Sequence, residues 1–464
     1  MATAQQTFLT SVNPATEEVL ARYRIFTDEQ IEQAIGQSRW AYRTWRQTSF
    51  AERATLFLQA AAYLRDHKAR LARLVTLEMG KPIEEAEAEV EKSAWNCEYY
   101  AENAARFLAA EPRQSNAKES YITFEPLGTV LAIMPWNFPL WQVFRFAAPA
   151  LMAGNTVLLK HASNVPQTAL AIEEVFRAVG FPEGVFRTLL VGGSTAEELI
   201  ADPRVAAVTF TGSDLAGSRV AAAAGRAIKK SVLELGGSDP FIVLGDADLD
   251  AAAKTAAKAR YLNAGQSCIA AKRVIVLDSV HDDFLQRFLA DVRSLRVGDP
   301  LERTTDVGPL ARGDLREALE RQISESVSQG ARVVLGGKRP RRRGYFCEPT
   351  VLAEVTPNMP VYREETFGPA VAIIRVRTVE EAIRVANDTP YGLSSSLWSQ
   401  DIERAMRLGQ RIEAGNLFIN GMSSSDPRLP FGGVKRSGYG RELSEFGIRE
   451  FTNIKTVWVG PAAA

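Results

Sequence analysis

The sequence predicts an α/β protein built on parallel sheets and divided into more than one folding unit. From residue 129 onward, short apolar runs alternate with helical patterns, with strands expected at 130–134 and 156–160 and helices at 140–152 and 168–179. This alternation is typical of βαβ units. The chain has 464 residues, more than one hydrophobic core usually organises, and at about 150 residues per domain this predicts roughly three units.

The segments around this series complete the prediction. Residues 28–107 carry apolar side chains at helical spacing with few breakers, so the N-terminal part is expected to be helical. A short strand at 231–235 leads into Gly236-Gly237, and a second alternating series begins with a strand at 241–244. The restart predicts a domain boundary near residue 237.

Composition excludes several classes of function. The 55 basic and 55 acidic residues cancel, so no global field attracts nucleic acid or an anionic membrane, and a small molecule is the favoured partner. The first 19 residues lack a signal-peptide pattern, and no run of eighteen apolar residues occurs. Three scattered cysteines are too few for a disulfide framework and indicate a reducing compartment, so we expect a cytoplasmic protein.

Cys268 is the candidate nucleophile. It ends the turn Gly265-Gln266-Ser267-Cys268, between a helix expected at 249–263 and a strand expected at 273–277. Loops carried on a rigid α/β scaffold often hold the chemistry, but a turn cysteine is also often a buried, inert thiol. A Cys-His hydrolase would need an imidazole. None of the three histidines lies in a glycine-rich turn: His67, His161 and His281.

Two polar side chains stand near strand ends. Glu234 precedes Gly236-Gly237 and has three interpretations: an ordinary capping or paired carboxylate, a ribose-binding acid about 20 residues after the Gly212 turn, or a general base with a pKa raised by desolvation. Asn137 lies at a strand-to-helix corner just before Pro139. Its amide could stabilise an oxyanion or cap the helix.

The turn at Gly212-Ser213 and the side chain of Arg145 each have two interpretations. The turn Gly212-Ser213 could bind a phosphate at a helix N-terminus, although the full G-x-G-x-x-G pattern is absent and a plain turn capped by Ser213 is the alternative. Arg145 shares a helix face with Trp141 and Gln142 among apolar residues. It either pairs with a buried acid or binds a substrate carboxylate.

Together these segments resemble the aldehyde dehydrogenase superfamily over almost the whole chain. Seven motifs occur in order: PWNFP at 135–139, GNTVLLK at 154–160, FTGS at 210–213, LELGG at 233–237, GQSC at 265–268, EETFGP at 364–369 and PFGGVKRSGYGRE at 430–442. Among members, the runs LLKHASN at 158–164 and ELGGSDPFIVL at 234–244, with the segment from FIN to PFGG, are most similar to the bacterial succinate semialdehyde dehydrogenases.

The resemblance implies a role for each candidate residue. Cys268 is expected to attack the aldehyde carbonyl, while the Asn137 amide and the Cys268 backbone N–H hold the oxyanion. Glu234 is expected to activate the water that hydrolyses the thioester, with Glu442 assisting the water relay. CoA-acylating relatives commonly lack this glutamate, so its presence favours a free acid as the product.

The resemblance also implies a nicotinamide cofactor, NAD or NADP, and no metal. The matching cofactor positions are Trp136, Lys160, Ser163, Gly212, Ser213, Glu365 and Phe367. Ser163 stands where NAD-preferring members often carry a glutamate, which would hold the ribose 2′-hydroxyl and repel a 2′-phosphate. Ser163 together with Lys160 therefore predicts the use of NADP as well as NAD.

The resemblance further implies a short carboxylated aldehyde as substrate. Arg145 and Ser425 fall at carboxylate-contacting positions of the succinate semialdehyde dehydrogenases, and Arg428 is a candidate second cation. Glutarate semialdehyde stays open, because one methylene contributes only about 1 to 3 kcal/mol of discrimination. A CoA-acylating enzyme and a catalytically silent family member are the remaining alternatives.

The implied architecture has three parts. A Rossmann-type NAD(P)-binding domain is expected at 1–107 and 127–236, an α/β catalytic domain at 237–451, and a β-extension at 108–126 and 452–464. The two pieces of the extension are expected to pair and to add strands to a neighbouring subunit, giving a homodimer or homotetramer.

Overall fold

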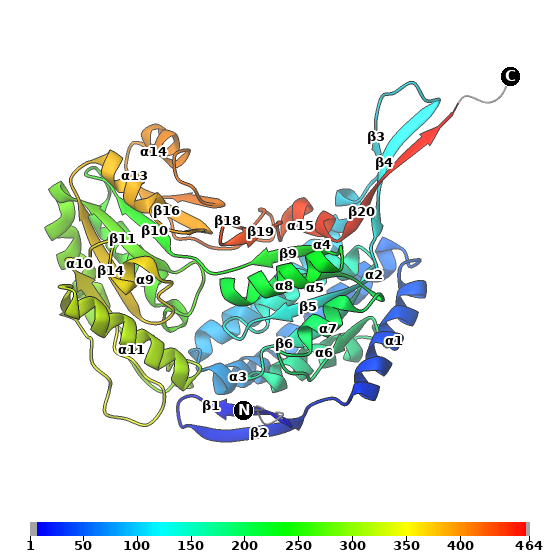
Figure 1. Ribbon diagram of the computed structural model, residues 1–464, viewed down its shortest axis with the longest axis horizontal. Coiled ribbons are helices and arrows are strands. Elements are labelled where there is room, and N and C mark those ends of the chain that lie inside the picture. Colours follow the sequence, from blue (N-terminus) through cyan, green and yellow to red (C-terminus); the bar gives the residue numbers. More distant parts are fainter. Residues whose placement is uncertain (1–6, 461–464) are drawn as a thin grey trace.

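The computed structural model describes residues 7–460 and contains two large sheets, each in a unit of its own, and a projecting arm (Figure 1). The outermost parts of two predicted ranges, 1–6 and 461–464, lie outside the described residues. No helix within residues 7–460 is long and apolar enough to cross a membrane.

The first unit contains a six-stranded sheet with the order β19-β9-β8-β5-β6-β7, parallel except for β19. Every residue of its inner strands β5 and β6 is buried, as expected where helices cover both faces. The strands are β5 (Thr129–Met134), β6 (Thr156–His161), β7 (Phe186–Thr188), β8 (Val205–Thr211), β9 (Lys230–Glu234) and β19 (Gly438–Tyr439).

Helices from two parts of the chain surround this sheet. Alanines and large apolar side chains of α2, α4 and α5 form one continuous core with the sheet. The helices are α1 (Asp28–Trp45), α2 (Phe50–Asp66), α3 (Lys68–Met79), α4 (Ile83–Phe107), α5 (Trp141–Met152), α6 (Pro166–Ala178), α7 (Ala196–Ala201), α8 (Asp214–Arg226) and α15 (Ser444–Glu450).

The second unit contains a seven-stranded sheet with the order β12-β13-β14-β11-β10-β16-β17, parallel except for the β12-β13 pair. Its strands are β10 (Asp239–Val243), β11 (Ala271–Leu277), β12 (Arg332–Leu335), β13 (Thr350–Ala353), β14 (Ala370–Val376), β16 (Ser394–Trp398) and β17 (Asn416–Ile419). Its helices are α9 (Leu249–Tyr261), η1 (Leu262–Gly265), η2 (Asp278–Val280), α10 (His281–Ser294), α11 (Gly313–Ser328), α12 (Pro360–Arg363), α13 (Val379–Asn387) and α14 (Ile402–Gly409).

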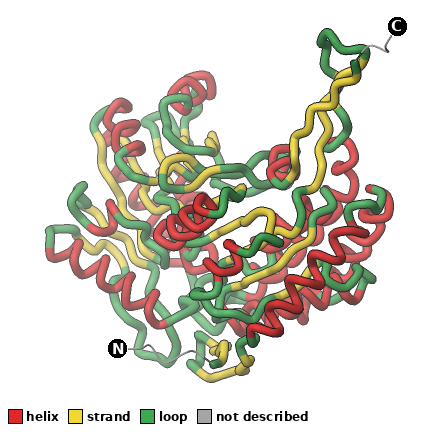
Figure 2. Tube along the Cα trace, turned by 45° about the vertical axis from the view of Figure 1, so that its right-hand side comes forward, coloured by secondary structure: helices red, strands yellow, loops and turns green. Residues whose placement is uncertain are grey.

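Three strands form the arm, which rises from the first unit in both the ribbon and the tube view (Figures 1 and 2). β20 (Thr452–Val459) pairs antiparallel with β4 (Glu119–Pro126) along its whole length, and β3 (Glu111–Pro112) pairs on the other side of β4. The outer edge of β20 has no partner strand within residues 7–460. The described parts of the two predicted segments, 108–126 and 452–460, thus meet in one small sheet.

Two features differ from the predicted organisation. The described part of the chain begins with a hairpin, β1 (Phe8–Asn13) and β2 (Glu18–Arg24), that the mixed polar pattern did not signal. The segment after residue 437, expected in the second unit, returns to the first, where β19 pairs with β9. Gly438 makes this possible: its φ is +113°, and a Cβ there would lie 1.9 Å from the carbonyl oxygen of Leu233.

Candidate active site

Cys268 follows a turn with left-handed backbone geometry. Within η1 the φ angles are +54° at Asn263, +52° at Ala264 and +73° at Gly265. A side chain in this region costs roughly 1–2 kcal/mol per residue, so surrounding contacts must hold the turn. One of them comes from α4, where Glu85 Oε2 accepts the backbone N–H of Asn263 at 2.8 Å.

Asn137 ties the first unit to this turn. Its side-chain Nδ2 donates to the carbonyl oxygen of Gln266 at 3.0 Å, and its own carbonyl accepts Asn263 Nδ2 at 2.8 Å. All three residues are buried. A side-chain amide has two N–H groups, so the second N–H of Asn137 remains available for an oxyanion formed at Cys268.

The capping role considered for Asn137 belongs to Glu89 instead. Glu89 Oε1 accepts the backbone N–H groups of Leu140 and Trp141 at 2.8 and 2.9 Å, at the beginning of α5. Its other oxygen, Oε2, forms a buried ion pair with Lys81. Helix α4 therefore fixes the entrance of α5 and leaves the Asn137 amide for the turn.

Two cavities meet at Cys268. One has a volume of about 320 Å³ and the other about 230 Å³, and within residues 7–460 only Cys268 and Gln142 line both. The thiol is half-buried between them. It can therefore contact one molecule on each side, which suits a transfer between a substrate and a cofactor.

The larger cavity brings together most of the residues expected to bind the cofactor. They are Trp136, Gly212, Ser213, Glu365 and Phe367. The rings of Trp136 and Phe367 meet edge to face at 5.8 Å. Ser213 caps α8 and the free N–H groups of that helix begin here, which favours an anion such as a pyrophosphate. These residues fit a dinucleotide.

Lys160 and Ser163 lie at the end of β6 and in the loop after it, and do not line the larger cavity. Lys160 is buried and forms no ion pair with any residue in 7–460. Burial lowers the pKa of Lys160, and no acidic side chain of the described residues offsets this effect. An unpaired, buried ammonium group is suited to hold an anionic group of a ligand.

Glu365 connects the turn after Glu234 to the backbone at Cys268. Its Oε1 accepts the backbone N–H of Gly237 at 2.9 Å and lies 3.2 Å from Lys272 Nζ, which also donates to the carbonyl oxygen of Cys268 at 2.6 Å. A Cβ at Gly236 would lie 2.5 Å from Glu365 Oε2. The glycine pair after Glu234 is therefore needed for this close approach.

Burial dominates the acid-base state of the reacting groups. It raises the pKa of the Cys268 thiol to about 12, with Lys272 and Arg145 offsetting part of the effect. Burial and the nearby charge of Glu442 raise the pKa of Glu234 well above its usual range. Neither carboxylate oxygen of Glu234 has a hydrogen-bond partner within residues 7–460. Such an isolated carboxyl group is suited to proton transfer.

Arg145 has a buried acid as its partner. Its Nε forms an ion pair with Glu442 Oε2, and both side chains are almost completely buried. Burial raises the pKa of Glu442 above its usual value, and the Arg145 guanidinium offsets part of this rise. Of the two interpretations of Arg145, the structure shows this pairing, and the same residue also lines the smaller cavity beside Cys268.

The comparisons with known proteins decide the family. The model of the Aldehyde dehydrogenase family matches residues 1–457. The chain belongs to the aldehyde dehydrogenase family. It is 51% identical over 451 residues to a probable succinate-semialdehyde dehydrogenase [NADP(+)] of Synechocystis, covering 97% of this chain and 99% of that protein. It is also 51% identical over 454 residues to succinate-semialdehyde dehydrogenase [NADP(+)] 1 of Mycobacterium tuberculosis, with the same coverage.

Solved structures agree on the fold. The succinic semialdehyde dehydrogenase of Streptococcus pyogenes in complex with NADP+ has a TM-score of 0.96 and 37% identity, covering 98% of this chain and all of that one. The succinate-semialdehyde dehydrogenase of Burkholderia pseudomallei has a TM-score of 0.95 and 36% identity, covering 98% and 95%. The aldehyde dehydrogenase fold predicted from the sequence is confirmed.

In this aldehyde dehydrogenase, the two other residues expected to contact the substrate are Ser425 and Arg428, and they lie in different places relative to Cys268. Ser425 lines the smaller cavity. Arg428 lines neither cavity at Cys268, because its guanidinium is exposed and forms a two-point pair with Asp426 only two residues away. The cation that does line the cavity beside Ser425 is Lys92, which the sequence reasoning missed.

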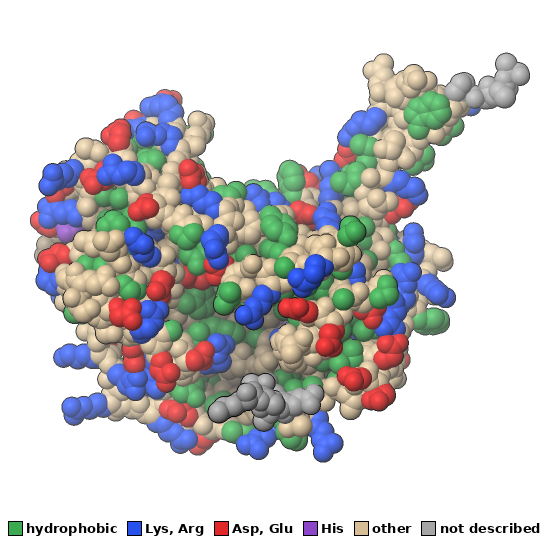
Figure 3. All heavy atoms as spheres, viewed as in Figure 1, with side chains coloured by type: hydrophobic (Ala, Val, Ile, Leu, Met, Phe, Trp, Pro, Cys, Tyr) green, Lys and Arg blue, Asp and Glu red, His purple; other side chains and the backbone are tan. Residues whose placement is uncertain are grey.

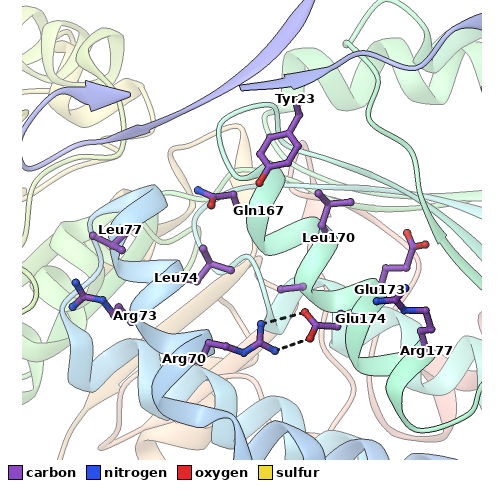
Figure 4. A pocket seen from close by; sticks show the side chains of 11 residues that line it. Tyr23, Arg70, Arg73, Leu74, Leu77, Gln167, Leu170, Glu173, Glu174 and Arg177 are labelled. Atoms are coloured by element: carbon purple, nitrogen blue, oxygen red, sulfur yellow. Dashed lines mark hydrogen bonds and ion pairs between the residues drawn. The ribbon is translucent and has the colours of Figure 1, made fainter. Parts of the chain in front are cut away.

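A cavity larger than either of the two at Cys268 is remote from the thiol. It lies between α3 and α6 and has a volume of about 550 Å³ (Figure 4). There Arg70 pairs with Glu174 at 3.1 Å, so the most central charges neutralise each other. No cysteine lines it. Size alone therefore does not identify the reacting site.

The raised pKa of Cys268 predicts how the thiol reacts with iodoacetamide in the absence of cofactor. Only the thiolate is alkylated, so inactivation should accelerate about tenfold per pH unit and should not level off below pH 10. The measurement is the loss of dehydrogenase activity with time from pH 6.5 to pH 10, with alkylation of Cys268 checked by peptide mapping. A rate that levels off near pH 7 would contradict the assigned electrostatics.

Proposed function

We propose that this aldehyde dehydrogenase oxidises succinate semialdehyde to succinate with NADP+. One observation carries the proposal: the small cavity beside Cys268 holds two cationic side chains, Lys92 and Arg145, together with Ser425. Such a cavity suits a short aldehyde with a carboxylate at its far end. The names of the similar proteins from Synechocystis and Mycobacterium tuberculosis support the same substrate and cofactor.

In the proposed reaction, the Cys268 sulfur attacks the aldehyde carbon. The thiol proton moves to Glu234 in its carboxylate form, and the oxyanion is held by the second N–H of Asn137 and the backbone N–H of Cys268. When bound, NADP+ supplies the hydride acceptor. Glu234 releases that first proton to solvent. As a carboxylate again, it takes a proton from the water that cleaves the Cys268 thioester and passes it to the departing sulfur, which releases the acid and restores the thiol.

The cofactor preference rests on Lys160 and Ser163. Lys160 carries a buried ammonium group without an acidic partner within residues 7–460, and Ser163 follows in the loop after the same strand. We propose that the 2′-phosphate of NADP lies here, where a glutamate in place of Ser163 would repel it. The Streptococcus pyogenes relative was solved with NADP+, which supports the assignment.

We also propose a cytoplasmic homodimer or homotetramer. A reducing compartment keeps thiols from forming disulfides, and Cys97, Cys268 and Cys347 are all free. The arm offers an unpaired strand edge and exposed apolar side chains, with Ile454 61% and Trp458 52% exposed. Figure 3 shows hydrophobic side chains at the surface of the arm. A second copy that covers this edge would remove an aggregation-prone surface.

The role of Glu234 predicts the behaviour of Glu234→Gln. The amide cannot accept the proton of the thiol or of the hydrolytic water, so NADPH formation in the first turnover should slow and steady turnover should nearly stop, each by at least about 100-fold. Stopped-flow absorbance measures NADPH formation in the first turnover, with Glu234→Asp as the variant that keeps a carboxylate and part of the turnover. A steady turnover rate close to that of the wild type would contradict the assignment.

The cofactor proposal predicts that Ser163→Glu lowers the kcat/KM ratio of NADP+ to NAD+ by at least about tenfold, because the new carboxylate repels the 2′-phosphate. Steady-state kinetics with both cofactors give the ratio. Ser163→Ala is the matched control, since it removes the hydroxyl without adding charge. A ratio unchanged in the glutamate variant would show that the phosphate lies elsewhere.

The assembly proposal predicts that Ile454→Lys and Trp458→Lys together reduce the oligomer to smaller species in size-exclusion chromatography with light scattering. Two ammonium groups would have to be buried without partners in the interface. Val19→Lys on β2 is the control, because it adds a charge to another exposed strand. An unchanged mass for the arm variant would place the interface elsewhere.

A further inference from the structure

The substrate cavity contains four charged side chains, and three of them already have partners. Glu89 pairs with Lys81 and caps α5, Glu85 accepts the N–H of Asn263, and Arg145 pairs with Glu442. The fourth is Lys92. It forms no ion pair with any residue in the described range 7–460.

The position of Lys92 is fixed by the fold. Residues 85, 88, 89 and 92 all line the cavity, which is the spacing of one face of helix α4. The ammonium Nζ lies 4.3 Å from the centre of the Trp141 ring, a cation–π contact that holds it at the wall of the cavity. The charge is therefore held in place before any ligand binds.

Ser425 completes a receptor for an anion. Lys92 Nζ donates to Ser425 Oγ at 2.9 Å. Because the serine oxygen accepts this bond, its own O–H remains available to donate, and the ammonium keeps two further N–H groups. Several converging donors and one unpaired positive charge are what a carboxylate requires.

In the free protein, the acidic side chains near Lys92 do not fully neutralise its positive charge. Burial, together with the nearby charge of Arg145, lowers the pKa of Lys92 to about 8, although Asp426 and Glu89 offset part of the change. Asp426 is itself paired with Arg428, and Glu89 with Lys81. A carboxylate bound at Nζ would supply the missing negative charge.

We propose that Lys92, with Ser425, binds the distal carboxylate of the substrate and determines the preference for acidic aldehydes. This inference rests on the proposed function, because it specifies how the same cavity recognises that substrate. Arg145 then acts mainly through its ion pair with Glu442, next to Glu234 and Cys268. The group that selects the substrate is thus separate from the arginine that lies close to the reacting atoms.

The test compares succinate semialdehyde with its methyl ester, which has the same chain without the charge. In Lys92→Met, kcat/KM for the acid should fall by about 10- to 100-fold, mainly through KM, as expected when a charge-assisted hydrogen bond is lost. The ester should lose far less. Lys92→Arg should restore most of the preference, and Lys254→Met, an exposed lysine on α9, is the matched control.

A second measurement does not depend on turnover of the acid. Succinate should inhibit oxidation of the ester competitively, and its inhibition constant should weaken in Lys92→Met by a factor similar to the loss in kcat/KM. Lys92→Gln provides a second variant if the methionine protein does not fold. The substitution Lys92→Met and the change from acid to ester remove the same interaction in the same cavity. The losses in kcat/KM caused by the two changes should therefore not be additive.

Each contrary outcome has a distinct meaning. Equal losses for acid and ester, or no loss for either, would overturn the role of Lys92 while the wild type still prefers the acid. A wild type that oxidises acid and ester equally well would overturn the proposed substrate itself and, with it, the carboxylate receptor. Unchanged inhibition by succinate in Lys92→Met would also overturn the assignment.

Discussion

The hydrogen bonds between the Asn137 corner and the turn before Cys268 are the constraint on which the site depends. Asn137 follows β5 of the first sheet, whereas Cys268 precedes β11 of the second. The proposed oxyanion donor and the proposed nucleophile thus come from different units. The bonds of Asn137 to Gln266 and Asn263 bring them together and hold a left-handed turn that would otherwise be unfavourable.

The close approach of the two units also determines the electrostatics of the buried groups around Cys268. Glu234 and Glu442 both lie near the guanidinium of Arg145, and burial raises the pKa of both carboxyl groups and of the Cys268 thiol. In this arrangement a proton is held near the sulfur. A thiol that is neutral at rest is protected from unwanted reactions, and it becomes a nucleophile when a neighbouring carboxylate can take the proton.

Local patterns in the sequence predicted the parts of the molecule that local physics determines. The buried strands β5 and β6 were predicted from apolar runs between helical patterns, and the motif around Glu234 predicted a turn at the end of a strand. For these strands and this turn, periodicity and turn residues within a short stretch carry the information. The pairing of β4 with β20 in one arm was instead expected from the family resemblance.

The features that the sequence did not reveal depend on contacts between distant residues. Nothing local indicates that Arg145 meets Glu442, which the return of β19 to the first sheet brings close to it. Ala264 has no composition signal for its positive φ, because distant hydrogen bonds impose it. Lys92 could have been found from the helical spacing of 85, 88, 89 and 92, but only once α4 is known to face Cys268.

The most direct test of the account is to find the covalent intermediate. The wild-type enzyme, mixed with NADP+ and succinate semialdehyde and quenched in acid within the first turnover, should carry a succinyl group on the peptide that contains Cys268 in mass spectrometry. Cys97 and Cys347, both buried away from the two cavities, should stay unmodified. A succinyl group on either of them, or none on Cys268 during active turnover, would contradict the central role of this thiol.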